Sequence, residues 1–88
     1  MTITQRIRNV LSQHAKLSAD AATIAEDTDL YAAGLSSFAT VQLMLALEDE
    51  FDIELPEKML NRRSFESIAA INAMVTAVSG PKLASGQN

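Results

Sequence analysis

The segment from Ser37 to Glu50 constrains the fold of this chain most, because a helix over it is apolar on nearly all sides. At about 100° per residue, one face collects the side chains expected in the core: Thr40, Leu43, Met44, Leu47 and Phe51. Phe38, Val41 and Leu45 fall on the opposite face. Such a helix is either buried on both sides or carries a second apolar surface. Complete burial is hard to arrange in 88 residues, which favours a surface for a partner.

Ser36 and Ser37 stand where this helix is expected to begin, just after Gly34. Serine is favoured there because its hydroxyl caps an unpaired backbone N–H, which contributes about 1 kcal/mol. The same place favours a phosphate, since free N–H groups and the positive end of the helix dipole meet there. On this ground alone, each hydroxyl is either a cap or an attachment point for a phosphorylated group.

Composition limits the classes of function. The chain has no cysteine, which excludes disulfides and a thiolate site, and no apolar run of about 18 residues that predicts a membrane span. The first residues lack the apolar core of a signal peptide, so we expect a cytoplasmic protein. A net charge of −4 argues against nucleic acid as a partner and favours partners with basic patches. The spacing after Asp27 and Asp29 fails the calcium-loop pattern at three positions.

The segments around the central helix predict an all-α four-helix bundle with three longer helices and one short one. The first helix is expected from about Ile3 to Lys16 with Thr2 as its cap, followed by a long loop from Leu17 to Ser36. The short stretch from Phe51 to Leu55 alternates like a strand but is interpreted as an extended connector.

The C-terminal part is predicted to hold the remaining two helices. Pro56 suits the first turn of a short helix, and Ser64 is expected to cap the last one, which Ser79-Gly80-Pro81 ends. Residues 1–79 would then form the domain and 80–88 a disordered tail. The predicted core is drawn from all of these helices and from the loop: Ile3, Ile7, Val10, Leu11, Leu30, Leu43, Leu47, Phe51, Ile53, Phe65, Ile68 and Val75.

The stretch from Asp29 to Pro56 resembles an acyl carrier protein. The family pattern has a leucine, a glycine, two spacer residues and a modified serine, then an aliphatic residue and an apolar helix. Here the loop reads Asp29-Leu30-Tyr31-Ala32-Ala33-Gly34-Leu35-Ser36-Ser37-Phe38, and the helix ends in the acidic run Glu48-Asp49-Glu50, followed by Phe51 and Pro56. The similarity extends from about Asp29 to Ile71 without a gap.

The resemblance implies that Ser37, flanked by Gly34 and Ser36, carries a covalent 4′-phosphopantetheine arm transferred from coenzyme A by a separate phosphopantetheinyl transferase. The terminal thiol of the arm would hold acyl groups as thioesters for enzymes of fatty-acid, polyketide or related lipid synthesis. The chain would then be a non-catalytic phosphoprotein. Two alternatives stay open: an aminoacyl or peptidyl carrier protein, and an unmodified helical interaction module in which Ser37 is only a cap.

The chain departs from the family pattern at the expected partner face. The residue before the modified serine is usually aspartate and the one after it leucine or isoleucine, whereas this chain has Ser36 and Phe38. Ser36 is also suited to cap the helix while Ser37 is modified. We expect a monomer that meets acyl-transferring or synthase enzymes with basic docking patches. The expected contact residues are Phe38, Val41, Gln42, Leu45, Glu48 and Asp49.

Overall fold

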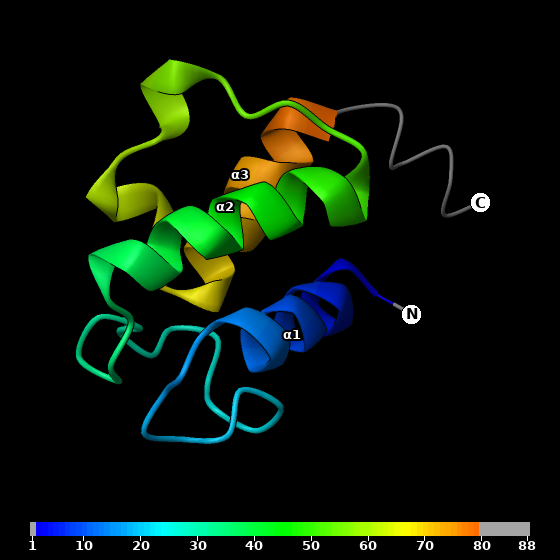
Figure 1. Cartoon of the computed structure of the whole chain (residues 1–88). Helices are drawn as coiled ribbons and strands as arrows, with labels where there is room; N and C mark the ends of the chain where they lie inside the picture. The colour runs from blue at the N-terminus through cyan, green and yellow to red at the C-terminus, as the bar shows by residue number, and fades with distance from the viewer. Residues whose placement is uncertain (1, 80–88) are drawn as a thin grey trace.

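The computed structural model describes residues 2–79; Met1 and residues 80–88, for which a disordered tail is predicted, lie outside the described residues. Residues 2–79 form three α-helices and two 3-10 helices: α1 (Ile3–His14), α2 (Ser37–Phe51), η1 (Glu57–Met59), η2 (Arg62–Phe65) and α3 (Ile68–Ser79). Figure 1 shows α2 across the middle of the fold, with α3 behind it and α1 below. The all-α prediction is confirmed for this part of the chain, whereas the four-helix count is not.

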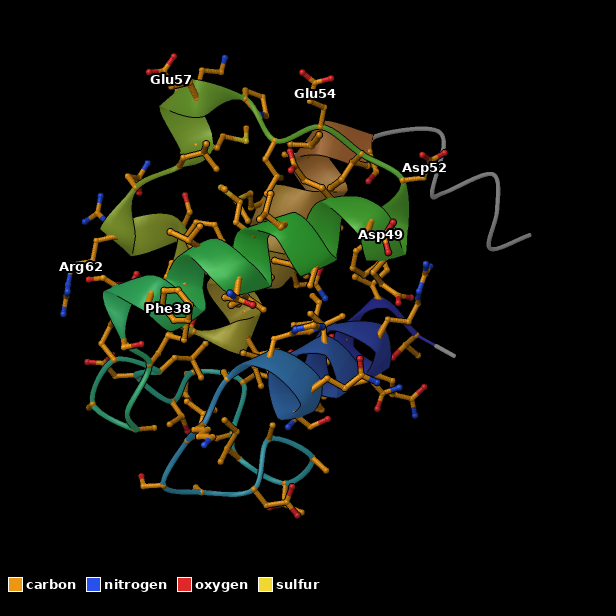
Figure 2. The ribbon with its side chains drawn as sticks, viewed as in Figure 1. Phe38, Asp49, Asp52, Glu54, Glu57 and Arg62 are labelled. Atoms are coloured by element: carbon orange, nitrogen blue, oxygen red, sulfur yellow. The ribbon has the colours of Figure 1, made fainter. Side chains whose placement is uncertain are left out.

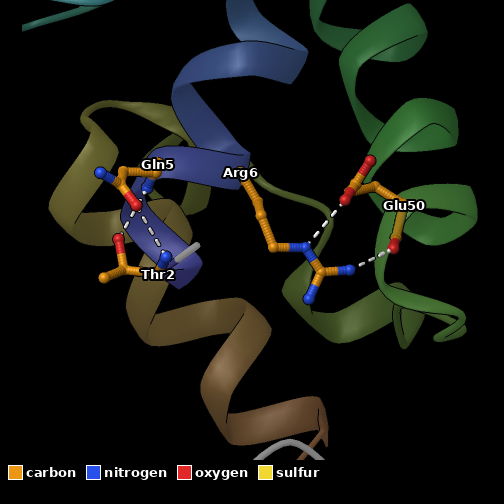
Figure 3. A network of polar contacts seen from close by, with 4 residues as sticks. All are labelled: Thr2, Gln5, Arg6 and Glu50. Atoms are coloured by element: carbon orange, nitrogen blue, oxygen red, sulfur yellow. Dashed lines mark hydrogen bonds and ion pairs between the residues drawn. The ribbon is translucent and has the colours of Figure 1, made fainter. Parts of the chain in front are cut away.

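The start of α1 is fixed by the predicted cap. The Thr2 hydroxyl accepts a hydrogen bond from the Gln5 N–H at 3.1 Å, and the Thr2 N–H donates to the Gln5 side-chain oxygen at 2.9 Å. This reciprocal pair is a capping box, in which the side chain of each residue accepts a hydrogen bond from the backbone N–H of the other (Figure 3). The helix ends at His14, two residues before the predicted Lys16, because Ala15 has extended backbone angles.

Arg6 joins the beginning of α1 to the end of α2. Its Nε donates to the Glu50 carboxylate at 2.8 Å and its Nη2 to the Glu50 carbonyl at 2.7 Å (Figure 3). The same guanidinium lies 4.4 Å from the centroid of the Phe51 ring. The pair is partly exposed, so its ionic part contributes little, but the contacts hold the two helices in register.

The connector after α2, residues 52–56, is held to the helix by the side chain of Glu48. The backbone turns at Asp52, which has a left-handed conformation with φ 51°, and no strand forms over the following residues of the described chain. Glu48 reaches this connector, and its carboxylate accepts a hydrogen bond from the Leu55 N–H at 2.9 Å. The connector prediction is confirmed. Glu48, however, which we expected to contact a partner, is half-buried and bonded within the fold.

The beginning of α3 differs from the prediction. The expected cap, Ser64, lies inside η2, where its N–H donates to the Asn61 side-chain oxygen at 3.1 Å. The side chain that stabilises the first turn of α3 is Ser67, whose hydroxyl accepts from the Ala70 N–H at 3.0 Å. The short helix expected after Pro56 is a single 3-10 turn, η1.

One core fills the space between the three α-helices and the long loop. The predicted core is confirmed except at four residues that are only partly buried: Ile3, Ile53, and Thr40 and Met44 on the expected core face of α2. Leu35 and Leu55 are buried although they were not predicted, because each leads into or out of α2. No helix within residues 2–79 has the length and apolar character needed to cross a membrane.

Candidate functional site

The loop before α2 delivers Ser36 and Ser37 to the surface. Leu30 and Leu35 are buried, and the Leu35 N–H donates to the Leu30 carbonyl at 2.9 Å, so the loop is anchored on both sides of Gly34. Gly34 has φ +114°, and a Cβ there would lie 3.2 Å from the Lys16 carbonyl oxygen. Glycine is therefore required for the backbone to pass this close to the end of α1.

Ser36 is the cap of α2. Its hydroxyl accepts a hydrogen bond from the Ala39 N–H at 3.0 Å. Its carbonyl accepts from the Thr40 N–H at 2.9 Å and from the Thr40 hydroxyl at 2.8 Å. The acceptor capacity of Ser36 is thus used to hold the first turn of the helix.

Ser37 is the first residue of α2, and it is exposed. Within residues 2–79 its hydroxyl has no hydrogen-bond partner, in contrast to that of Ser36. The N–H groups of Ser37 and Phe38 belong to the first turn, where the helix supplies no carbonyl for them. The position therefore combines a free hydroxyl with the positive end of the helix dipole, which favours a phosphate by about 0.3–1 kcal/mol.

The described residues around Ser37 supply no machinery to activate its hydroxyl. No carboxylate or histidine lines the groove beside it, and no group of three or more metal-ligating side chains occurs in the described part of the chain. A serine hydroxyl without an adjacent base is a weak nucleophile. The side chains described in this groove therefore offer Ser37 no adjacent base.

A groove of about 290 Å³ opens beside Ser37, between α2 and the segment that contains the two 3-10 helices. Its lining is mainly apolar and comes from three parts of the chain: Tyr31, Ser37, Thr40, Val41, Met44, Leu60, Asn61, Arg62 and Phe65. The groove was not predicted, because it depends on how the segment after Pro56 folds back over α2.

Tyr31 and Arg62 form one wall of this groove. The Tyr31 hydroxyl donates to the Arg62 carbonyl at 2.8 Å, and the Arg62 guanidinium lies 3.9 Å from the centroid of the Tyr31 ring. Burial raises the pKa of the Tyr31 phenol, and the positive charge of Arg62 opposes that rise. The wall therefore presents a neutral phenol and a cation. No local pattern indicates this contact between residues 31 positions apart in the sequence.

The predicted partner residues divide into two groups. Phe38, Val41 and Leu45 are 75%, 52% and 56% exposed. Gln42 and Asp49 are exposed as well, whereas Glu48 is turned towards the connector. Figure 2 shows Phe38 near the beginning of α2 and Asp49 near its end. The second apolar surface thus exists, and its contact with a partner stays a prediction.

Comparisons with known proteins add to this geometry. The pattern of the family described as "Phosphopantetheine attachment site" matches residues 5–74. The chain is 54% identical over 72 residues to the aminoacyl carrier protein of Agrobacterium fabrum. These aligned residues make up 82% of this chain and 87% of that protein. It is 40% identical over 60 residues to the mitochondrial acyl carrier protein of Saccharomyces cerevisiae, or 65% of this chain and 48% of that protein.

A solved structure is also similar to this chain. It is the crystal structure of an engineered Bradyrhizobium japonicum glycine:[carrier protein] ligase complexed with carrier protein from Agrobacterium tumefaciens and ATP. The match has a TM-score of 0.84 and 51% sequence identity, and it covers 88% of this chain and 100% of the matched chain.

Proposed function

The chain belongs to the phosphopantetheine-attachment carrier family, and from this premise we propose that Ser37 carries the arm and that the cargo is an aminoacyl group. As a member of this family the chain is a carrier without catalytic activity of its own, and 4′-phosphopantetheine is its covalent cofactor. The attachment residue and the cargo are the two parts of the proposal.

The difference between the two serine hydroxyls supports Ser37 as the attachment residue. Ser36 holds the first turn of α2 through the Ala39 N–H, so its modification would remove a helix cap. The Ser37 hydroxyl is exposed and makes no hydrogen bond within the described residues. The proposal that Ser37 carries the arm rests on this difference between the two hydroxyls.

The surroundings of Ser37 fit a phosphodiester followed by a flexible arm. The first-turn N–H groups of α2 provide positive potential at the hydroxyl, and the cationic Arg62 lines the same groove as Ser37. Val41, Met44 and Leu60 provide an apolar floor in the adjoining groove. When bound, the arm supplies the thiol that holds the cargo as a thioester, which this cysteine-free chain cannot supply itself.

The cargo proposal departs from the preference that we drew from the sequence. The resemblance alone placed fatty-acid or polyketide intermediates first and aminoacyl or peptidyl cargo second. The Agrobacterium fabrum relative is more similar, over a larger share of both chains, than the mitochondrial acyl carrier protein. The similar solved structure holds a glycine:[carrier protein] ligase. These comparisons support the aminoacyl alternative, with glycine as the first amino acid to test.

In this proposal the fold of the chain exposes Ser37 to partner enzymes, and those enzymes catalyse the reactions. Gly34 and the anchored loop place the start of α2 at the surface, and Ser36 keeps its first turn formed. The proposed partners are a phosphopantetheinyl transferase, which would modify Ser37, and an ATP-dependent ligase, which would load the amino acid.

The cargo is tested with the modified protein. It is incubated with a glycine:[carrier protein] ligase, glycine and ATP, and intact mass is measured before and after treatment with hydroxylamine, which cleaves thioesters. We expect a mass gain of one glycyl group that hydroxylamine removes. A modified protein that accepts fatty acyl groups from an acyl ligase, but no amino acid from several aminoacyl ligases, would contradict the cargo proposal.

A further inference from the structure

We propose that Arg62 keeps a loaded amino acid out of the groove beside Ser37, so that the aminoacyl end of the arm stays in solvent. Arg62 is then a positioning residue, since it determines where the cargo lies without taking part in loading. The inference rests on the proposed function, because it concerns an amino acid carried at Ser37. The charges on which it depends belong to this chain.

The groove beside Ser37 has one positive charge and no negative charge to balance it. Among the described residues that line it, Arg62 is the one with a formal charge. The Tyr31 phenol on the same wall stays neutral at neutral pH, because burial raises its pKa. No carboxylate of residues 2–79 forms an ion pair with Arg62. A second cation in this groove would therefore meet a like charge and no counter-charge.

Two contacts with Tyr31 hold Arg62 at the wall of the groove. The guanidinium lies 3.9 Å from the centroid of the Tyr31 ring, and the Tyr31 hydroxyl donates to the Arg62 carbonyl at 2.8 Å. The first contact orients the side chain and the second fixes the backbone. Figure 2 shows Arg62 near the beginning of α2, the end at which Phe38 lies. Although Arg62 is exposed, its charge is thus a fixed part of the wall.

Two carboxylates act on the Tyr31 phenol, but neither lines the groove. Asp29 and Glu66 raise the pKa of Tyr31, each by less than Arg62 lowers it. Both line a separate cavity. The Asp29 carboxylate also accepts hydrogen bonds from two backbone N–H groups of the turn that follows it, at 2.9 and 3.3 Å. An ammonium group in the groove would therefore find no carboxylate of the described residues to pair with.

An amino acid becomes a cation when it is loaded. Its carboxyl group forms the thioester, whereas its α-amino group, with an ordinary pKa of about 7.7–8.0, stays mostly protonated at neutral pH. Moving this ammonium from water into an apolar groove without a counter-charge is strongly unfavourable, and the like charge of Arg62 adds to the cost. Glycine has no side chain whose burial could offset that cost. We therefore expect loaded glycine to remain in solvent, where an enzyme can reach it.

The test is NMR of the carrier with a glycyl arm, which a phosphopantetheinyl transferase attaches directly from glycyl coenzyme A. The methyl groups of Val41 and Leu60 line the groove and report whether the cargo enters it. In the unchanged chain, these methyl shifts should be the same with the glycyl arm as with the unloaded arm. The glycyl methylene should also show no nuclear Overhauser effect to them. In Arg62→Glu, whose carboxylate can pair with the ammonium, glycyl loading should shift both methyl signals.

Arg63→Glu is the matched control, because Arg63 is exposed on η2 but does not line the groove. Thermal unfolding of each variant before loading separates a change of cargo position from loss of folding. Shifts of Val41 and Leu60 on glycyl loading of the unchanged chain would overturn the proposal, and so would equal responses of Arg62→Glu and Arg63→Glu. If Arg62→Glu does not fold, the nuclear Overhauser measurement on the unchanged chain decides. Refusal of glycine by the ligase leaves this measurement possible and counts against the proposed cargo alone.

Discussion

Replacing Leu47 with alanine should destabilise the domain severely, whereas the same change at Leu45 should not. The two leucines lie two positions apart on α2, but Leu47 is fully buried and Leu45 is 56% exposed. Truncating a buried leucine removes its transfer free energy and leaves a cavity, which together cost about 2–5 kcal/mol. A surface truncation changes the free energy of unfolding by about 0.5 kcal/mol or less.

These magnitudes are large for so small a domain. At about 0.05–0.15 kcal/mol per residue, the described part of the chain has a total stability of about 4–12 kcal/mol. Each lost kcal/mol lowers the melting temperature by about 4–8 °C in a domain of this size. The Tm of Leu47→Ala should therefore fall by at least about 8 °C.

Urea unfolding followed by circular dichroism measures both variants against the unchanged protein. If Leu47→Ala does not fold, Ile7→Val at another fully buried position gives a milder test, with an expected cost of about 0.5–1.5 kcal/mol. Equal losses of stability in Leu45→Ala and Leu47→Ala would refute the assignment of the two faces of α2.

Three further predictions concern the loop, the connector and the groove wall. Gly34→Ala should lower the free energy of unfolding by more than about 1 kcal/mol, because alanine is strained at φ +114°; an unchanged urea midpoint would contradict this. Glu48→Ala should cost about 1.5–3 kcal/mol through the unpaired Leu55 N–H, against about 0.5 kcal/mol or less for Asp49→Ala, and equal costs would contradict a stabilising role for the Glu48–Leu55 hydrogen bond. Because the pKa of Tyr31 is raised in the fold, its contribution to stability should be intact below about pH 10 and lost as pH rises through the folded pKa. Tyr31 is the single tyrosine and the chain has no tryptophan, so tyrosinate absorbance reports this titration alone, and a midpoint at or below that of the urea-unfolded chain would contradict it.

The central helix and the position of the two serines could be predicted because their signals are local. The period of Leu43, Leu47 and Phe51 identifies the buried face without knowledge of the neighbours. The glycine and serines before α2 mark a helix start through their own backbone and side-chain chemistry. These features depend on neighbouring residues in the sequence, so contacts with distant segments change them little.

The features that were missed depend on contacts between distant segments. Ser64 and Ser67 are equally good caps in isolation, and the choice falls on Ser67 because burial of Phe65 in η2 moves the start of α3. Glu48 looks solvent-facing on a helical wheel, but the turn at Asp52 brings the Leu55 N–H within its reach. The groove beside Ser37 likewise requires the fold of the segment after Pro56.

The hydroxyl of Ser37 is proposed to receive the arm, and intact mass after incubation with coenzyme A and a broad-specificity phosphopantetheinyl transferase tests this assignment. The unchanged chain and Ser36→Ala are expected to gain the mass of one phosphopantetheine, whereas Ser37→Ala gains none. A gain that persists in Ser37→Ala, or no gain in the unchanged chain with several transferases, would contradict attachment at Ser37.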